Sequence, residues 1–464
     1  MPARRTGIVG QIQPYVDEDF ASVLQLSTIR RTFSGSCFGI SIRKSGELQL
    51  IRFETGKRTR VMTKGQGADV ETLFTRAFGH APPRVIRVPA SLEFLGGHTE
   101  KHKGLSYSAA INLYVEIAFV PHSDGKIELV HGTELKRTKL WLHECVPGQG
   151  PNWAVPVMAV VSYLKRRGFV VNGFRAAMVN GIPNGIGLGE SAAECLATAL
   201  AIRQMCPFRV NESGAMEPPR MDKRGDLPPI LRKERFLFAE LCAGAEREFF
   251  SGYEKLYPFL APLMAREFHL VQTDYLHTKV ELHSLIGEVA IVICDSGIRE
   301  PHIGLRVDQF ERAASNAAEK IGLRTLRSLE PGLLNGARLK LRSREFGAAK
   351  FVMGECHRVV VGEKALQGGE LLLFGDSLFQ SHTAAQCFAG ITCPELDVLI
   401  DLARDHPACH GARFFGAGLG GATLNLVDWT QLDSFIGNMQ AGYYHATGKK
   451  LECFQVRPVD GVFD

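Results

Sequence analysis

Two glycine-rich stretches and one polar turn carry the residue types in this sequence that could bind or transform a small molecule. The first stretch reads Gly-Ile-Pro-Asn-Gly-Ile-Gly-Leu-Gly-Glu-Ser-Ala-Ala-Glu over residues 181–194, between an expected strand at 176–179 and an alanine- and leucine-rich helix at 191–205. Backbone N–H groups in such a turn approach an anion closely, and the positive helix end points at it, so the pattern predicts a phosphate site. Taken alone, the stretch is better explained as a loop that only turns the chain, since no Walker lysine follows. The candidate phosphate-binding residues are Pro183, Gly185, Gly187, Leu188, Gly189, Glu190, Ser191 and Ala192.

The other two motifs are less specific when each is taken alone. Residues 411–423 form a second glycine stretch that enters an expected strand, and in isolation a glycine-rich bulge explains it better than a binding site does. Residues 87–104 place polar groups in a turn after a strand, which a surface loop would also do. The residues of interest are Gly416, Gly418, Gly420 and Gly421 in the glycine motif, and His98, Glu100 and His102 in the turn.

The elements that must position these motifs predict an α+β fold, because helices and strands come in mixed order without uniform βαβ units. Alternation at residues 38–63 predicts two or three strands in a small meander, and a helix follows at 70–78. A charged, proline-rich segment, residues 206–232, predicts a surface insertion between two halves. We therefore expect an N-terminal extension (1–69), an N-terminal domain (70–231) and a C-terminal domain (232–464). The C-terminal half is expected to contain helices at 234–250, 307–321, 374–384 and 394–404, and strands at 289–294 and 422–427.

Composition places the chain among globular proteins. It has 464 residues, of which 45% are hydrophobic and 22% charged, and its apolar runs fall short of a membrane span. Eleven scattered cysteines without metal-like spacing suit reduced thiols and imply no structural metal, so we expect a cytoplasmic protein. Residues 1–69 hold eleven Lys/Arg against six Asp/Glu, which accounts for the whole net charge of +5. Without interleaved aromatics this basic tail favours a solvated extension over a nucleic-acid-binding arm.

Together, the three motifs resemble the galactokinase branch of the GHMP kinases in order and spacing. That family carries a sugar-binding turn, a phosphate loop and a late Gly-Ala-Gly-Phe-Gly-Gly motif. Further matching stretches bring the resemblance to about residues 70–430; they are Leu73–Gly79, Trp153 with the helix after it, Ala245–Phe249, Phe374–His382 and Thr392–Asp397. The resemblance implies a two-domain GHMP kinase fold that binds ATP, Mg²⁺ and a galactose-like sugar between its domains, with transfer of a phosphoryl group to a sugar hydroxyl.

The departures from the family pattern fall on the positions that carry its chemistry. The arginine expected to neutralise charge is Ser91, and the sugar-binding glutamate is Gly97, whereas His98 and Thr99 are kept and the neighbouring aspartate is Glu100. An ungapped alignment places Pro258 where the family has its catalytic aspartate.

Few groups are available to replace the lost ones. Weak candidates for a replacement base are Glu254 and Asp274, and each would need a rebuilt loop. The family's sugar-contacting tyrosine is also missing, since residues 306–311 offer only Phe310. No catalytic residue is therefore assigned.

Glu190 stands where the family has a serine that faces phosphate and Mg²⁺. Two like charges about 4 Å apart repel by roughly 1 kcal/mol in water and about 4 kcal/mol at an effective dielectric near 20, so an uncompensated carboxylate opposes ATP. Because the helix N-terminus favours a carboxylate, Glu190 could fill the anion site itself, and we favour this occlusion. The alternative is that Glu190, with Ser191, ligates Mg²⁺ directly.

Three hypotheses follow. The first is a sugar kinase with a rearranged base, for which turnover would require Glu254 or Asp274. The second is a pseudokinase that binds a sugar, a nucleotide or a protein partner, which binding without turnover would identify. The third is nucleic-acid association through residues 1–69, which steep salt dependence would reveal. Family resemblance favours the kinase label, whereas the site chemistry favours the pseudokinase.

Overall fold

The computed structural model describes residues 37–42, 48–53, 69–132, 135–219, 221, 228–249, 255–285, 287–299 and 303–463. The chain divides into two compact units, residues 1–61 and 62–464. In the first unit, β1 (Cys37–Ile42) and β2 (Leu48–Phe53) pair as an antiparallel hairpin. These are two of the strands expected at 38–63, and the rest of that segment lies outside the described residues.

A seven-stranded sheet forms the first layer of the larger unit. Its long central strand is β4, which pairs with β3 along one edge and with β10 and β7 along the other; β5 and β6 extend the sheet beyond β7, and β11 extends it beyond β10. All pairs are antiparallel except β5 with β7. The strands are β3 (Arg84–Leu95), β4 (Leu105–His122), β5 (Lys126–His131), β6 (Lys136–Trp141), β7 (Gly173–Asn180), β10 (His269–Asp274) and β11 (Lys279–Ser284).

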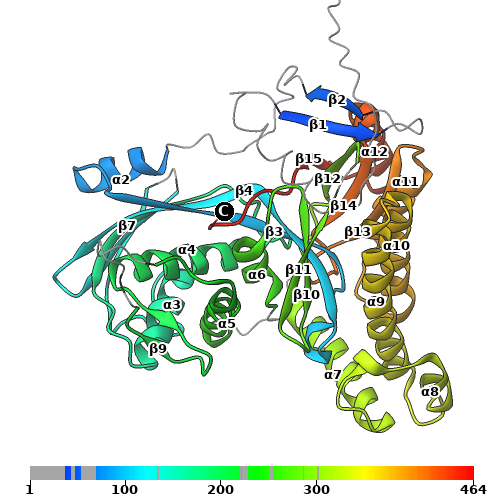
Figure 1. The fold of residues 1–464 in the computed structure, drawn as a ribbon, viewed down its shortest axis with the longest axis horizontal. Coiled ribbons are helices and arrows are strands. Elements are labelled where there is room, and N and C mark those ends of the chain that lie inside the picture. The colour runs from blue at the N-terminus through cyan, green and yellow to red at the C-terminus, as the bar shows by residue number, and fades with distance from the viewer. Residues whose placement is uncertain are drawn as a thin grey trace, which may run out of the picture. The chain divides into compact units, whose positions relative to one another are not determined.

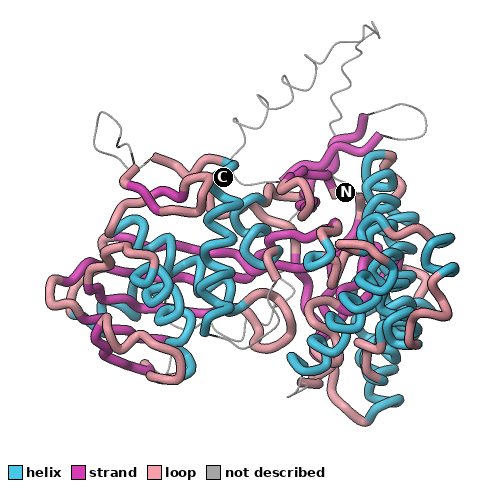
Figure 2. The backbone as a smooth tube through the Cα atoms, turned by 90° about the horizontal axis from the view of Figure 1, so that it is seen from below, coloured by secondary structure: helices cyan, strands magenta, loops and turns pink. Residues whose placement is uncertain are grey.

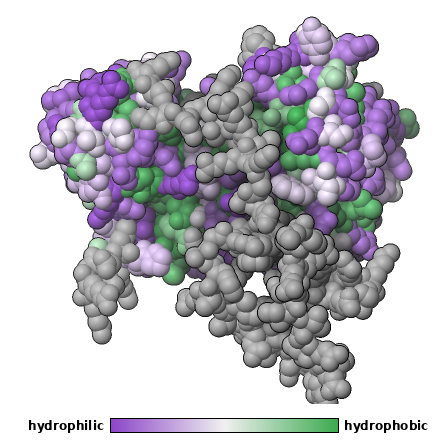
Figure 3. Space-filling model, turned by 90° about the horizontal axis from the view of Figure 1, so that it is seen from above, coloured by the Kyte–Doolittle hydropathy of each residue, from purple (hydrophilic) through white to green (hydrophobic). Residues whose placement is uncertain are grey.

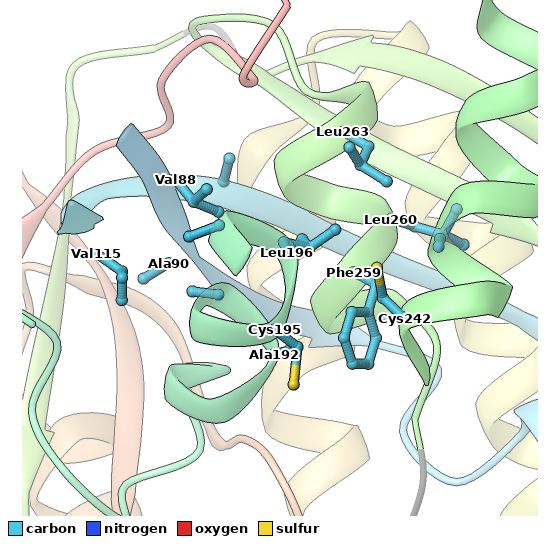
Figure 4. Close-up of a cluster of buried hydrophobic side chains, with 14 of the residues drawn as sticks. Val88, Ala90, Val115, Ala192, Cys195, Leu196, Cys242, Phe259, Leu260 and Leu263 are labelled. Atoms are coloured by element: carbon cyan, nitrogen blue, oxygen red, sulfur yellow. The ribbon is translucent and has the colours of Figure 1, made fainter. Parts of the chain in front are cut away.

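Helices cover both faces of this sheet. The helices α3 (Val155–Arg166), α4 (Glu190–Met205), α5 (Arg232–Phe249) and α6 (Tyr257–Met264) lie below it in Figure 1, and α2 (Val70–Phe78) lies above it. Figure 4 shows apolar side chains of β3 and β4 meeting those of α4, α5 and α6, among them Val88, Leu196 and Phe259, all of which are fully buried. This core fixes the starts of α4 and α6 beside β3, and the candidate site lies there.

A four-stranded antiparallel sheet with the order β13-β14-β12-β15 forms the second layer. A second apolar cluster joins this sheet to the helices of the C-terminal region, which Figure 2 shows in cyan. The strands are β12 (Val289–Asp295), β13 (Cys409–Phe414), β14 (Ala422–Asp428) and β15 (Glu452–Val456). The helices are α7 (Ile303–Ile321), α8 (Pro331–Gly336), α9 (Ser343–Gln367), α10 (Leu371–Ala384), α11 (Pro394–Asp405) and α12 (Leu432–Thr447), and a π-helical turn (Ala385–Ala389) continues α10.

The two layers exchange segments across the boundary expected at residues 231 and 232. Strands β10 and β11 follow that point in the chain but belong to the first sheet. The chain also returns to the first sheet after β15: Val459 N–H donates to Ala110 O at 2.9 Å, and Val462 N–H donates to Pro262 O at 2.9 Å. The expected α+β class is confirmed, although sequence halves and spatial layers differ.

The expected insertion at 206–232 contains a small hairpin, β8 (Arg209–Val210) with β9 (Met216–Glu217). Arg203 at the end of α4 anchors it, donating to Phe208 O at 2.9 Å and to Pro228 O at 3.0 Å. Four short 3-10 turns complete the described elements: Glu100–His102, Asn152–Ala154, Leu326–Ser328 and Trp429–Gln431.

The surface and the thiols agree with a globular protein. Figure 3 shows hydrophilic side chains over most of the described surface in that view, with hydrophobic ones in smaller patches. None of the described helices combines the length and apolarity needed to cross a bilayer. The cysteines from Cys145 to Cys453 are free thiols.

Candidate active site

The first glycine stretch forms a tight loop between β7 and α4, which we call the glycine loop (residues 181–191). Gly185, Gly187 and Gly189 all have φ between 70° and 91°, a region that favours glycine. At Gly189 a side chain would collide with Ser91 Oγ and press on Pro258, so only glycine fits there. Backbone near Gly185 and Gly187 is exposed. The loop thus has the conformation expected of an anion-binding turn.

Glu190 at the start of α4 turns back onto this loop. Asn180 Nδ2 donates to Glu190 Oε1 at 3.1 Å and to Glu194 Oε1 at 2.9 Å, which holds the Glu190 carboxylate beside the loop. Burial, and after it the charge of Glu194, raise the pKa of Glu190 to about 7. A carboxylate held by Asn180 therefore stands at the start of α4, beside the loop.

The second glycine stretch, the glycine motif (residues 416–421), packs directly on the glycine loop. A Cβ atom at Gly187 would lie 3.1 Å from Gly416 Cα, and one at Gly421 would lie 3.3 Å from Ile186 O. Arg299, which follows β12, adds a link: its Nε donates to Asn184 O at 3.3 Å. The two stretches, about 230 residues apart in sequence, thus form one surface, as the resemblance implies.

The polar turn (residues 96–104) lies at the end of β3, and the protein itself binds its polar groups. Gly96 N–H donates to Glu355 Oε2 at 3.0 Å, and Thr99 Oγ1 donates to Gly96 O at 2.9 Å. Glu100 Oε2 accepts from Leu256 N–H at 2.8 Å, just before α6. Residues 91–99 are all buried, in contrast to the exposed backbone of the glycine loop.

A buried ion pair fills the space beside this turn. Lys255 Nζ lies 3.1 Å from Glu93 Oε2 and donates to Gly416 O at 2.8 Å, and the two side chains are 8% and 2% exposed. A Cβ atom on Gly97 would lie 3.1 Å from both Glu93 Oε2 and Arg413 Nη2. The position where the family has a sugar-binding glutamate therefore borders a carboxylate and a guanidinium group that occupy its side-chain space.

His98 is enclosed by aromatic and charged side chains. Its ring lies 5.3 Å from the Phe310 ring, edge to face, and Nδ1 lies 3.7 Å from Glu311 Oε1. Burial, and after it the charge of Lys255, lower the pKa of His98, so the ring is neutral at pH 7. The buried surroundings leave it no route to a solvent-borne ligand in this conformation.

Ser91 and Pro258 meet at Gly189, where the resemblance places the family's arginine and catalytic aspartate. Ser91 N–H donates to Leu188 O at 3.0 Å, and Ser91 Oγ is buried with no hydrogen-bond partner among the described residues. Pro258 lies in the first turn of α6 and offers no proton acceptor on its side chain. The fold thus brings together the positions that the sequence alignment predicted, but with side chains that carry neither charge nor base.

Of the two candidate replacement bases, Asp274 is the one that lies among the described residues. Glu254 lies outside the described residues. Asp274, at the end of β10, forms a double ion pair with Arg327 at 2.6 and 2.7 Å and borders a cavity of about 210 Å³ with Lys279 and Glu281. Burial alone would raise the pKa of Asp274, but hydrogen bonds from Arg327 and His277 outweigh it and hold the pKa well below its usual range. Such a carboxylate is a weak base.

Sequence reasoning missed the Glu93–Lys255 pair. The signal was present, because Glu93 stands where the family has an uncharged asparagine and Lys255 precedes the Pro258 position. A charge gained on each of two site segments indicates a compensating pair. The pairing itself could be seen only once the fold brought residues 93 and 255 together.

Three family models match the chain. They are described as the galactokinase galactose-binding signature (residues 72–121), the GHMP kinases N terminal domain (156–217) and the GHMP kinases C terminal domain (363–445). The chain is 26% identical over 394 residues to the galactokinase of Roseiflexus sp. (strain RS-1), covering 84% of this chain and 95% of the relative. It is also 26% identical over 385 residues to Homo sapiens galactokinase, covering 81% and 92%.

Solved structures agree on the fold. Lactococcus lactis galactokinase complexed with galactose superposes with a TM-score of 0.74 at 20% identity, covering 84% of this chain and 97% of that one. A mevalonate kinase superposes with a TM-score of 0.55 at 16% identity, covering 81% and 99%. The layered fold and the two domain matches show that the chain has the fold of the GHMP kinases. Within that class, the galactose-binding signature and the galactokinase relatives show that the chain belongs to the galactokinase family.

Proposed function

We propose that this galactokinase-family protein is a pseudokinase, which has lost sugar phosphorylation and uses the kinase fold for binding. The observation that carries the proposal is the buried Glu93–Lys255 pair, which fills the space beside the polar turn. A sugar entering there would have to displace two charged groups from each other. Breaking a buried pair costs about 3–5 kcal/mol, which sugar binding would have to supply before gaining any affinity.

The chemistry of phosphoryl transfer argues in the same direction. Transfer depends on positioning and on neutralising the charge of the moving phosphoryl group, with a base for the attacking hydroxyl. Ser91 and Pro258, at the point where α6 meets the glycine loop, supply neither function. A missing base alone typically costs about 10² to 10⁴-fold, and groups that act as a unit fail together.

The family implies ATP and Mg²⁺, and the residues present fit them only in part. The glycine loop from Pro183 to Ala192 would hold phosphate oxygens through its backbone, with Ser191 as the oxygen ligand for Mg²⁺. Against this, Glu190 brings a carboxylate to the position expected for the phosphate. We therefore propose that the protein binds ATP only weakly, because the Glu190 carboxylate lowers the affinity for its phosphates.

An active sugar kinase is the second candidate, and the same carboxylate favours it if Glu190 ligates Mg²⁺. In that case Glu190 would attract Mg-ATP through the metal ion instead of repelling its phosphates. Phosphorylation of any sugar would still need a catalytic base, and neither Ser91 nor Pro258, which lie beside Gly189, supplies one. A cytoplasmic location and a sugar, nucleotide or protein ligand belong to the proposal as well. We assign no nucleic acid to the basic tail.

A coupled ADP-release assay over a panel of sugars tests the loss of activity. We expect no turnover above background for the wild-type protein, and none for Pro258→Asp, because Ser91 still lacks charge and Gly97 still lacks a sugar contact. Wild-type turnover on the order of 1 per second with any sugar would reject the pseudokinase. Calorimetry with Mg-ATP, with and without galactose, then reports binding without turnover.

A further inference from the structure

A hollow of about 500 Å³ lies among the C-terminal helices, outside the candidate active site. Its walls come from α9, α10, α11 and the π-helical turn, which lie side by side in Figure 1. The volume falls within the range of about 300–1,000 Å³ that is typical of small-molecule sites. The π-helical turn ends α10, with Gly390 in the left-handed region as its cap.

The charged groups at this hollow, which we call the helical pocket, favour an anion. Arg358 from α9 and Arg404 from α11 line it together with Asp376. Arg358 is already paired with the buried Glu355, so Arg404 is the lining cation that has no ion pair among the described residues. Arg404 is exposed, and its Nη2 donates only a long bond of 3.2 Å to Thr383 Oγ1. Lys350 adds a further cation nearby, with Nζ 4.1 Å from the ring centroid of Phe388. The guanidinium group of an arginine can donate two parallel hydrogen bonds to two oxygens of one phosphate.

The remaining lining residues suit the body of a hydroxylated ring. Phe379 and Phe388 supply ring surface, and Phe388 is 37% exposed despite its size. The Arg404 guanidinium lies over the Phe379 ring, 5.1 Å from its centroid, so a sugar would meet the uncovered part of each ring. Asp376 and Gln380 provide an acceptor and an amide, already joined at 2.6 Å, with which ligand hydroxyl groups can bond. An inorganic anion would use only the arginines, whereas a purely apolar ligand would cover Arg404 and Asp376 without offering either of them a new polar partner.

We propose that the helical pocket binds a hexose monophosphate, with the phosphate at Arg404 and Arg358 and the sugar ring against Phe379 and Phe388. This site is independent of the proposed function, because it uses none of the residues at the glycine loop. It nevertheless adjoins the polar turn through one residue: Glu355 holds Arg358 at 2.7 Å through Oε1 and the Gly96 N–H through Oε2. An occupant of the pocket would thus lie two side chains from the turn.

Calorimetric titration of the full chain with galactose 1-phosphate, glucose 1-phosphate and glucose 6-phosphate tests the proposal. We expect at least one of them to bind, and Arg404→Gln to weaken it about tenfold or more, as for a lost charged hydrogen bond. Arg87→Gln, which changes an exposed arginine on β3, is the matched control and should leave binding unchanged. Hydrogen exchange should show ligand-dependent protection in residues 376–388.

Three outcomes would overturn the assignment. These are no binding by any of the three phosphates, equal binding by inorganic phosphate, and unchanged affinity in Arg404→Gln. Because Arg358 also holds the buried Glu355, its removal could unfold the region. Phe388→Ala therefore serves as the second variant, and it should weaken the hexose phosphates while leaving the exchange pattern of the free protein unchanged.

Discussion

The glycine loop contacts β3 at Ser91, and the polar turn follows at the end of the same strand, yet the two regions differ in how they have departed from the family. The glycine loop keeps its backbone conformation, and Gly185 and Gly187 remain exposed to solvent. The polar turn is buried, and Glu93 and Lys255 fill the space beside it. The glycine loop is altered by one carboxylate, that of Glu190, whereas the space beside the polar turn is filled by a buried ion pair.

This difference matters because the two changes are not equally reversible. A carboxylate at the loop interacts with a ligand through charge, which a substitution or a change of pH removes. A buried ion pair has become part of the folded structure, so removing one partner leaves an unpaired buried charge. We therefore expect a single substitution of Glu190 to restore nucleotide binding. Sugar binding should not be restored in this way, because removing Glu93 or Lys255 to make room for a sugar would destabilise the fold.

The largest expected effect tests the buried ion pair beside the polar turn. Lys255→Met should destabilise the fold by about 3–5 kcal/mol, because Glu93 would remain buried without its partner. Lys279→Met, which removes an exposed pair with Glu281, is the control and should cost less than about 1 kcal/mol. Thermal unfolding compares the two, and Glu93→Met with Lys255→Met should recover most of the loss. Equal thermal midpoints for Lys255→Met and Lys279→Met would contradict a structural role for the Glu93–Lys255 pair.

The next prediction concerns the carboxylate at the glycine loop. Glu190→Ser and Glu190→Gln should both tighten Mg-ATP binding by about tenfold, within the roughly 1–4 kcal/mol of repulsion that the carboxylate exerts. The glutamine variant keeps the side-chain size and so separates charge from space. Calorimetry measures both, and weaker binding in the serine variant would favour Glu190 as a Mg²⁺ ligand.

A smaller effect should follow from pH. The pKa of Glu190, about 7, is raised above the ordinary 4.5, so the group is mostly neutral at pH 6 and mostly charged at pH 8. Mg-ATP should therefore bind wild type more tightly at pH 6 than at pH 8, relative to Glu190→Gln, which corrects for titration of ATP itself. The same raised pKa means that this group's contribution to stability falls as pH rises from 4.5 through 7. Identical pH profiles for the two proteins would show that Glu190 does not face the phosphates.

The smallest effect is expected outside both regions. A chain that begins at Met62 should unfold within a few degrees of the full chain, because residues 62–464 form a compact unit of their own. It should also keep the Mg-ATP affinity of the full chain. A larger fall in the thermal midpoint would show that the extension packs onto the kinase-like unit.

Much of this architecture could be predicted because the signals are local. The helix expected at 70–78 begins and ends where predicted, and α4 starts one residue before the predicted helix, at Glu190. The glycine loop was found because its glycines stand between an apolar strand and an alanine-rich helix. The layer boundary could not be found this way, since β10 pairs with β4 through contacts that no local pattern specifies.

The site shows the same division. Glu190 could be placed by its position at the helix start, whereas its bond to Asn180 depends on how the loop brings the end of β7 to the start of α4. Asp274 was a candidate base on sequence grounds, and only the structure reveals Arg327, 53 residues away, as its partner. Contacts between side chains from distant segments of the chain cannot be predicted from composition and motif spacing.

The return of the chain end to the first sheet also limits how the molecule can move. Strand β15 ends at Val456 in the second sheet, and Pro458, two residues later, bridges to Ile111 of β4. Two extended residues span only about 7 Å, so at this edge the sheets cannot separate further while the tail stays bonded. The tail therefore links the two sheets through a short stretch of chain, and a ligand that enters between the layers cannot do so by widening this edge.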